Sequence, residues 1–155
     1  MPKFLDSLPM ILSRSLDGIM PVYRSLFQKH EITDQQWRVM RALWEQKHLT
    51  SKEISEITLL PSPSLVGILD RLEKKGFIGR LRSVKDRRLV YIVPTQAGRE
   101  FQELMIPKIE QIHDSFMEKV TAEEWDELKR LLDKLIGYKP TLSLIHISEP
   151  TRTER

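Results

Sequence analysis

The chain has 155 residues, 40% of them hydrophobic and 30% charged, which is typical of one folded domain. Its 25 Lys and Arg against 22 Asp and Glu leave a net charge of only +3, and the absence of cysteine excludes disulfides and thiol chemistry. Four scattered histidines, no apolar run long enough to span a membrane and no signal-peptide pattern predict a cytoplasmic protein without metal, cofactor or membrane partner.

The first predicted element is a long helix over residues 4–28. Its apolar residues recur at intervals of three and four, as on one face of a helix. They are Leu5, Leu8, Leu12, Leu16, Ile19, Tyr23, Leu26 and Phe27.

Three shorter helices are predicted next, and each has a start signal. Thr33 with Gln36, and Thr50 with Glu53, have the spacing of a capping box, in which each side chain bonds the backbone N–H of the other residue. The third helix runs over about 63–75, with Pro63 suited to its first turn and Gly76 to a left-handed stop.

The second and third of these helices, joined by a turn near 59–62, match a helix-turn-helix. Residues 76–82 and 88–94 are predicted strands joined by a loop over 83–87, and a ribbon in this place is a wing. The predicted fold is therefore mainly α with a small β-wing.

The basic residues gather in this part of the chain. Residues 61–93 hold eight Lys or Arg against three Asp or Glu, whereas residues 95–136 hold six against ten. A local basic patch on a modestly charged chain favours a polyanion such as DNA, although a solvated charged face remains the simpler alternative.

The C-terminal region is again helical. Apolar residues from Phe101 to Val120 recur every three or four positions, Thr121 and Glu124 form a third capping box, and Gly137 ends the last helix. The stripes over about 4–28 and 95–137 exceed what the small winged helix-turn-helix over about 33–94 can cover. We therefore expect one domain over 1–139 that forms a homodimer through its terminal helices, and we treat residues 140–155 as a disordered or artefactual tail.

The wing carries the motif of a known family. Asp86, Arg88, Thr95 and Gly98 in "DRRLVYIVPTQAG" resemble the wing signature of the MarR family of transcriptional regulators, and "LVGILDRLEKKGFIGR" resembles its recognition helix and first wing strand. The resemblance covers about residues 10–138. Pro94 departs from it, because the family usually has Leu there.

"ITDQQWRVMRALWE" and "PSLVGILDRLE" are similar to the branch of the family that regulates the breakdown of homoprotocatechuate and related hydroxylated aromatic acids. This resemblance implies a homodimer that represses a catabolic operon from a palindromic operator and is released by a small aromatic carboxylic acid.

A recognition helix presents its N-terminal half to the major groove of double-stranded DNA. Its two serines, Ser62 and Ser64, can bond base edges or phosphate, or one of them can simply cap the helix. An aliphatic side chain can meet a thymine methyl, and the arginine can reach phosphate or pair with Glu73. The candidates are Ser62, Ser64, Leu65, Val66 and Arg71.

In the wing, Arg88 is the candidate for insertion into the minor groove. The resemblance implies that Asp86 holds a wing arginine in position; the alternative is an ordinary surface pair. Lys85 and Arg87 are candidate phosphate contacts, and Arg80 and Arg82 are further sites along the first strand.

The effector site implied by the family lies where the dimer helices meet the DNA-binding lobe. An aromatic carboxylate needs a flat apolar wall and a cationic clamp. Trp37 and Arg38, with Arg24 and His30 from the end of the first helix, supply these groups, although Trp37 is equally suited to the core and Arg38 to a solvated surface.

No glycine-rich phosphate loop, nucleophile elbow or zinc-ligand spacing appears in the sequence, so we expect no enzyme. The alternative to a DNA-binding regulator is an adaptor whose winged domain binds protein and does not respond to a ligand. The arginine density of the wing argues against it.

Overall fold

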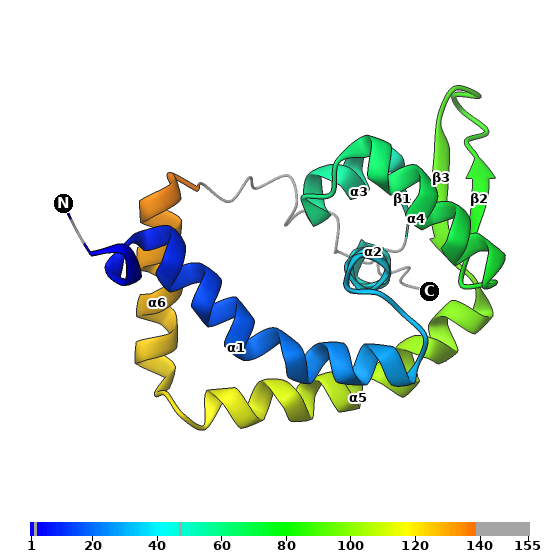
Figure 1. The fold of residues 1–155 in the computed structure, drawn as a ribbon. Coiled ribbons are helices and arrows are strands. Elements are labelled where there is room, and N and C mark those ends of the chain that lie inside the picture. Colours follow the sequence, from blue (N-terminus) through cyan, green and yellow to red (C-terminus); the bar gives the residue numbers. More distant parts are fainter. Residues whose placement is uncertain (2, 47, 139–155) are drawn as a thin grey trace, which may run out of the picture. The chain divides into compact units, whose positions relative to one another are not determined.

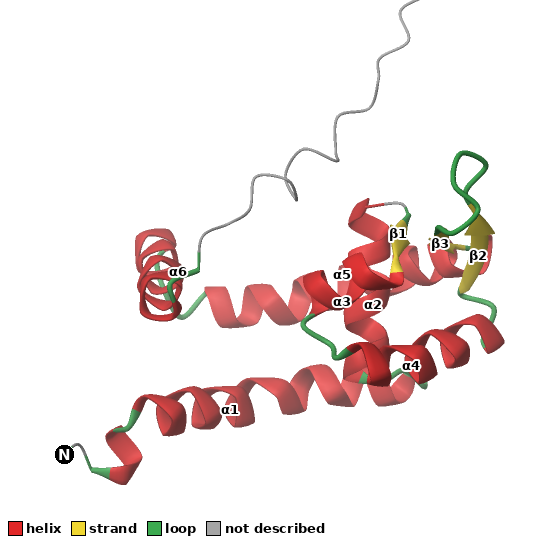
Figure 2. Cartoon of the chain, turned by 90° about the horizontal axis from the view of Figure 1, so that it is seen from above, coloured by secondary structure: helices red, strands yellow, loops and turns green. Residues whose placement is uncertain are grey.

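The computed structural model describes residues 1, 3–46 and 48–138, so the predicted tail at 140–155 lies outside the described residues. The chain is mainly helical with one small sheet (Figure 2). The architecture is a winged helix-turn-helix, as the sequence predicts. In chain order (Figure 1) the elements are η1 (Phe4–Asp6), α1 (Leu8–Lys29), α2 (Asp34–Gln46), β1 (Leu49–Thr50), α3 (Ser51–Thr58), α4 (Ser62–Lys74), β2 (Ile78–Arg82), β3 (Val90–Pro94), α5 (Gln96–Met117) and α6 (Ala122–Ile136).

The helix predicted over residues 4–28 begins later than expected. Ser7 has an extended backbone, with φ −70° and ψ 142°, and separates the short 3-10 helix η1 from α1. Pro9 in the first turn of α1 lacks the N–H that would be unsatisfied there in any case. From Leu8 onward the prediction is confirmed, and α1 continues through Pro21.

All three predicted capping boxes are present. The Thr33 N–H donates to Gln36 Oε1 at 3.1 Å, and the Gln36 N–H donates to Thr33 Oγ1 at 3.1 Å. The boxes that open α3 and α6 have the same reciprocal bonds. These helices begin where the sequence predicts because each box needs only residues three positions apart.

The sheet has three strands, and the sequence predicted only two. β1 pairs antiparallel with β3, which also pairs antiparallel with β2, so the order is β1-β3-β2. Leu49 of β1 lies opposite Ile92 of β3, and both side chains are buried. A strand of two residues has no detectable period, so its sequence carried no signal.

The helix-turn-helix, the sheet and the start of α5 meet at Gly98. A Cβ atom on Gly98 would lie 2.1 Å from the carbonyl oxygen of Phe77, so only glycine fits at this approach. Trp44 Nε1 donates to the Gly98 carbonyl at 3.1 Å, and Phe77 stacks on Phe101 with ring centroids 4.7 Å apart. These contacts hold α2, α5 and the α4–β2 turn together.

The chain forms two compact units that divide within α5, one over residues 1–112 and one from residue 113 onward. The buried core lies in the first unit. In the second unit, which contains the end of α5 and α6, the His113 ring meets Trp125 edge-on at 6.3 Å. Within the described ranges, no helix combines the length and apolar character needed to cross a membrane.

We predict that Gly98→Ala lowers the free energy of unfolding by about 3 kcal/mol or more, because the new methyl group must displace backbone rather than a side chain. Gly67→Ala is the matched control, since its Cβ would meet only the Arg71 guanidinium at 3.5 Å or more. Alanine there should raise stability by about 0.5–1 kcal/mol. Urea unfolding monitored by circular dichroism measures both; equal stabilities would contradict the close approach.

Candidate DNA interface and effector clefts

The turn of the helix-turn-helix is held by local bonds. Leu59 ends α3 in the left-handed region, with φ 58° and ψ 25°. Ser55 Oγ then donates to the Leu60 carbonyl at 2.6 Å, and Thr58 Oγ1 donates to the Ile54 carbonyl at 2.6 Å. The start of α4 is therefore fixed relative to α3.

One face of α4 is buried and the other is open. Leu65 is only 1% exposed and belongs to the core together with Ile68, Leu69 and Leu72. The prediction that Leu65 contacts DNA is therefore wrong, since its side chain points to the inside of the lobe. Val66 is 61% exposed and remains available for a base contact.

Neither serine at the start of α4 is the N-cap. The N-cap is Pro61, and no side chain caps the helix there, so the capping alternative for Ser62 and Ser64 is wrong. Ser62 Oγ lies 3.4 Å from Ser55 Oγ, and both Ser62 and Ser64 are exposed. In the described chain no side-chain cap bond is present at Pro61, and an exposed helix start of this kind suits a phosphate.

Arg71 lies on the exposed face, one turn after Gly67. Its guanidinium folds back over Gly67 and lies 3.5 Å from where a Cβ of that residue would be. Glu73, the neighbour proposed as its partner, pairs with Arg80 instead. Among the described residues no ion pair involves Arg71, which leaves its guanidinium available for phosphate.

The wing loop is organised around Asp86. Its Oδ1 accepts a hydrogen bond from the Arg88 backbone N–H at 3.0 Å, and its own N–H donates to Ser83 Oγ at 3.2 Å. Its carbonyl accepts from the Leu89 N–H at 3.0 Å. Asp86 thus positions the backbone of Arg88, whereas no ion pair joins it to a guanidinium in the part of the chain that the structure describes.

The cations of the wing differ in what they contact. Lys85, Arg87 and Arg88 are exposed in the loop that projects beyond β2 and β3 (Figure 1), and Arg82 is exposed on β2. The guanidinium of Arg80 instead binds two carboxylates of α4. In the free protein Arg80 therefore contacts two acids of α4, and its predicted DNA contact stays a prediction.

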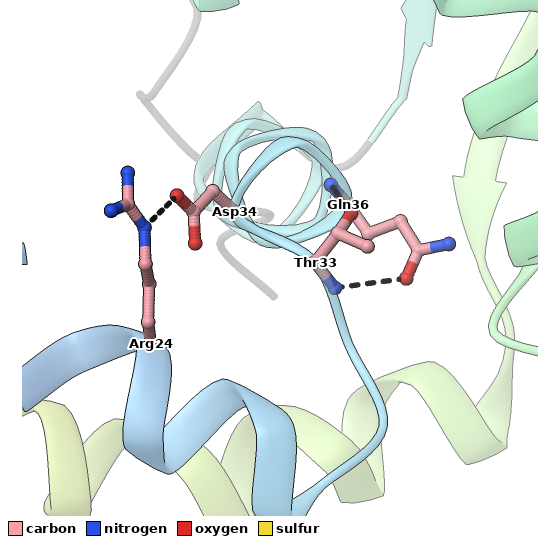
Figure 3. Close-up of polar contacts among 4 residues, drawn as sticks. All are labelled: Arg24, Thr33, Asp34 and Gln36. Atoms are coloured by element: carbon pink, nitrogen blue, oxygen red, sulfur yellow. Dashed lines mark hydrogen bonds and ion pairs between the residues drawn. The ribbon is translucent and has the colours of Figure 1, made fainter. Parts of the chain in front are cut away.

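A first cleft, of about 630 Å³, lies between the end of α1 and the start of α2, with Arg24 and Arg38 in its lining. Figure 3 shows Arg24 reaching to α2, where its Nε donates to Asp34 Oδ2 at 3.0 Å, beside the Thr33–Gln36 capping box. Because Asp34 holds this guanidinium, a ligand carboxylate must displace an ion pair to reach it.

A second cleft, of about 420 Å³, lies between α2 and α3. Trp37 provides an aromatic wall, and Arg38 and Arg41 provide two guanidinium groups. Arg41 Nη2 is paired with Glu45 Oε1 of the same cleft at 2.7 Å. The Trp37 ring is also stacked on Phe27 with centroids 5.3 Å apart, so it is both part of the core and part of the cleft. Arg38 Nη1 donates to the Thr58 carbonyl over a long 3.4 Å.

The structure thus separates the four residues predicted for the effector. Arg24 lines the first cleft and Trp37 the second, while Arg38 lines both. His30 lines neither of these two clefts, because its ring packs edge-on against Phe101 at 6.4 Å. The prediction did not name Arg41, which also lines the second cleft, four residues after Trp37 on the same helix face.

Comparison with known proteins agrees with this fold. Residues 32–90 match the MarR family. The homoprotocatechuate degradative operon repressor of Escherichia coli is 31% identical over 132 residues, which are 85% of this chain and 89% of that protein. The chain belongs to the MarR family.

Two solved structures extend the comparison. NadR in complex with 4-hydroxyphenylacetate is 30% identical, with a TM-score of 0.76 over 90% of this chain and 99% of that one. A mutant MarR from Escherichia coli complexed with operator DNA is 22% identical and shares the fold, with a TM-score of 0.76 over 87% and 99% of the two chains.

This MarR-family protein is therefore a DNA-binding transcriptional regulator rather than an enzyme, as the sequence predicts. The same relationship removes the alternative of a protein-binding adaptor.

Proposed function

We propose that this regulator represses an operon for the breakdown of an aromatic acid, binds a palindromic operator as a homodimer, and is released by an aromatic carboxylate. The observation that carries the DNA interface is the exposed basic wing beside the open face of α4. A helix in the major groove with a basic loop on the flanking groove is how winged domains read DNA.

Within this interface the residues divide by what they can recognise. Val66, Ser62 and Ser64 lie on the open side of α4, where they can meet base edges. Lys85, Arg82 and Arg87 have exposed cations suited to phosphates, as does Arg71. Arg88 has its backbone fixed by Asp86, so less backbone freedom of the loop is lost when Arg88 enters the minor groove.

We predict that Arg88→Ala weakens specific operator binding by about 1–3 kcal/mol, through lost groove contacts. Lys85→Ala should weaken binding to all DNA sequences alike and lower the slope of log K against log salt concentration by about one. Lys134→Ala on α6 removes the same charge outside the winged domain and should change neither. Fluorescence anisotropy over a salt series measures all three, and unchanged affinity in both wing variants would remove the wing from the interface.

The homodimer follows from apolar surface that the monomer leaves uncovered. Eight large, exposed apolar residues lie on η1 and α1, and four lie on α6. This is a larger exposed apolar set than a stable monomer shows. They are Phe4, Leu5, Leu8, Ile11, Leu12, Leu16, Ile19 and Val22, and Leu128, Leu131, Leu135 and Ile136. A second copy of the chain offers the same faces and can cover both.

We predict that the protein is dimeric at micromolar concentration and that Leu12→Glu shifts it to smaller or unfolded species, because a carboxylate would be buried in the interface. Arg14→Glu, on the same helix at a polar position, is the matched control and should stay dimeric. Sedimentation equilibrium with circular dichroism distinguishes these outcomes. A folded wild-type monomer would contradict the proposal.

For the effector we favour the cleft between α2 and α3. It combines the flat wall of Trp37 with the guanidinium of Arg38, the pair of features that an aromatic carboxylate needs. Arg41, paired with Glu45, lies in the same lining. The names of two similar proteins support this ligand class, one regulating homoprotocatechuate degradation and one bound to 4-hydroxyphenylacetate.

The position of this cleft also suggests how release works. Arg38 bonds the Thr58 carbonyl at the end of α3, directly before the turn that leads into α4. A carboxylate that recruits Arg38 would take this weak bond away from the turn. Two recognition helices must lie about 34 Å apart to read a palindrome, so a ligand that favours another spacing weakens DNA binding.

We predict that 4-hydroxyphenylacetate binds the free protein more tightly than the operator complex, with a coupling of about 1–3 kcal/mol that is equal in both directions. Arg41→Gln should weaken ligand binding. Arg24→Gln should not, because Arg24 lines the first cleft and not the second. Isothermal calorimetry of each variant, with and without bound operator, measures the ligand affinity and the coupling. The reverse order of the two variants would move the site to the first cleft, and no binding or zero coupling for hydroxylated phenylacetic and benzoic acids would end the effector proposal.

A further inference from the structure

Arg80 joins the wing to the recognition helix through two ion pairs. Its Nη2 lies 2.7 Å from Asp70 Oδ1, and its Nε lies 2.9 Å from Glu73 Oε2. The two carboxylates are three residues apart on α4, so they face the same side of the helix. Arg80 therefore uses two nitrogens of one planar guanidinium to bind two neighbouring carboxylates.

The place of Arg80 on the strand gives this contact its importance. Ile78, at the start of β2, is buried in the core, whereas Leu81 and Arg82, at the end of β2, are exposed. From Leu81 to Leu89, no hydrogen bond or ion pair reaches α4 in the described part of the chain. Arg80 is thus the last polar link between the recognition helix and the wing before the loop.

The pairs also remove an electrostatic conflict. Asp70 and Glu73 lie on the exposed side of α4, and unpaired carboxylates there would repel a phosphate backbone. The guanidinium of Arg80 is neutralised by these two carboxylates. Among the described residues no ion pair involves Arg82, Lys85 or Arg88. A cation that is already neutralised by two carboxylates is a poor phosphate ligand.

We infer that Arg80 is a positioning residue: it sets the distance between wing and recognition helix by holding Asp70 and Glu73, and does not itself bind DNA. The inference rests on the proposed interface of α4 and the wing. Isolated surface pairs contribute little to stability, so its effect should appear in DNA affinity and wing mobility rather than in unfolding.

The test is a double-mutant cycle with operator DNA. Arg80→Met in the wild-type background should lower affinity by about tenfold. The same change in an Asp70→Asn, Glu73→Gln background should add almost nothing, because the partners are already gone. If Arg80 instead contacts a phosphate, the loss should be equal in both backgrounds and the salt slope should fall by about one in each, which would overturn the inference.

Hydrogen exchange of the free protein gives an independent readout. The Ser83 and Leu89 amides, bonded within the wing loop, should exchange faster in Arg80→Met than in wild type, because the wing loses its link to α4. Arg82→Met is the matched control, on the same strand and the same face, and should leave this exchange unchanged. Unchanged exchange in Arg80→Met would also overturn the inference.

A substitute variant and a comparison with Arg88→Ala separate the possible outcomes. If Arg80→Met unfolds, Arg80→Lys replaces it, since lysine keeps the charge but lacks the planar fork that spans two carboxylates, and an intermediate loss is then expected. If Arg88→Ala weakens operator binding but the Arg80 variant does not, only this inference fails. If neither variant weakens binding, the proposed interface itself is wrong.

Discussion

The approach of Gly98 to the Phe77 carbonyl is the constraint on which the DNA-reading lobe depends. At this point the backbone of α5 touches the turn between α4 and β2, and no side chain larger than hydrogen fits between them. Thr95 strengthens the junction, because its hydroxyl bonds the Gly76 carbonyl and accepts from the Gly98 N–H. Trp44 adds a bond from α2. The recognition helix, the wing and α5 are thereby fixed at one place.

The surface formed by α4 and the wing is positive partly because its carboxylates are engaged within the protein. Residues 61–93 contain only three carboxylates, and each is engaged within the protein. Asp70 and Glu73 bind Arg80, while Asp86 accepts the backbone N–H of Arg88. The negative groups therefore shape the surface, and most of the cations remain exposed. A net charge of +3 is enough for a DNA-binding protein when the charge is distributed in this way.

The proposed effector site would place ligand chemistry next to the helix-turn-helix. α2 contributes to both clefts, and Arg38 lines both. On the side toward α3, Arg38 bonds the last carbonyl of that helix, and the strained left-handed residue Leu59 follows immediately. Such a turn has little room for adjustment, so a change at Arg38 can be transmitted to the start of α4.

The sequence by itself determined the features that depend on residues within one helical turn or one strand. Thr33 with Gln36 and Thr50 with Glu53 start their helices, and Gly76 has the positive φ expected of a helix stop, because cap and stop bonds are local. The basic ribbon and its MarR-like motif were equally readable in the sequence, and they indicated both the fold and the DNA-binding role.

The tertiary structure decided which side of each element faces what. Periodicity did not separate Leu65, which is buried, from Val66, which is exposed, and it did not divide Arg24 and Trp37 between two clefts. Nor did local pattern show that Arg80 binds carboxylates ten and seven residues away, or that Leu49 and Thr50 complete the sheet. These outcomes depend on contacts between segments distant in sequence, and such contacts form only when the chain has packed.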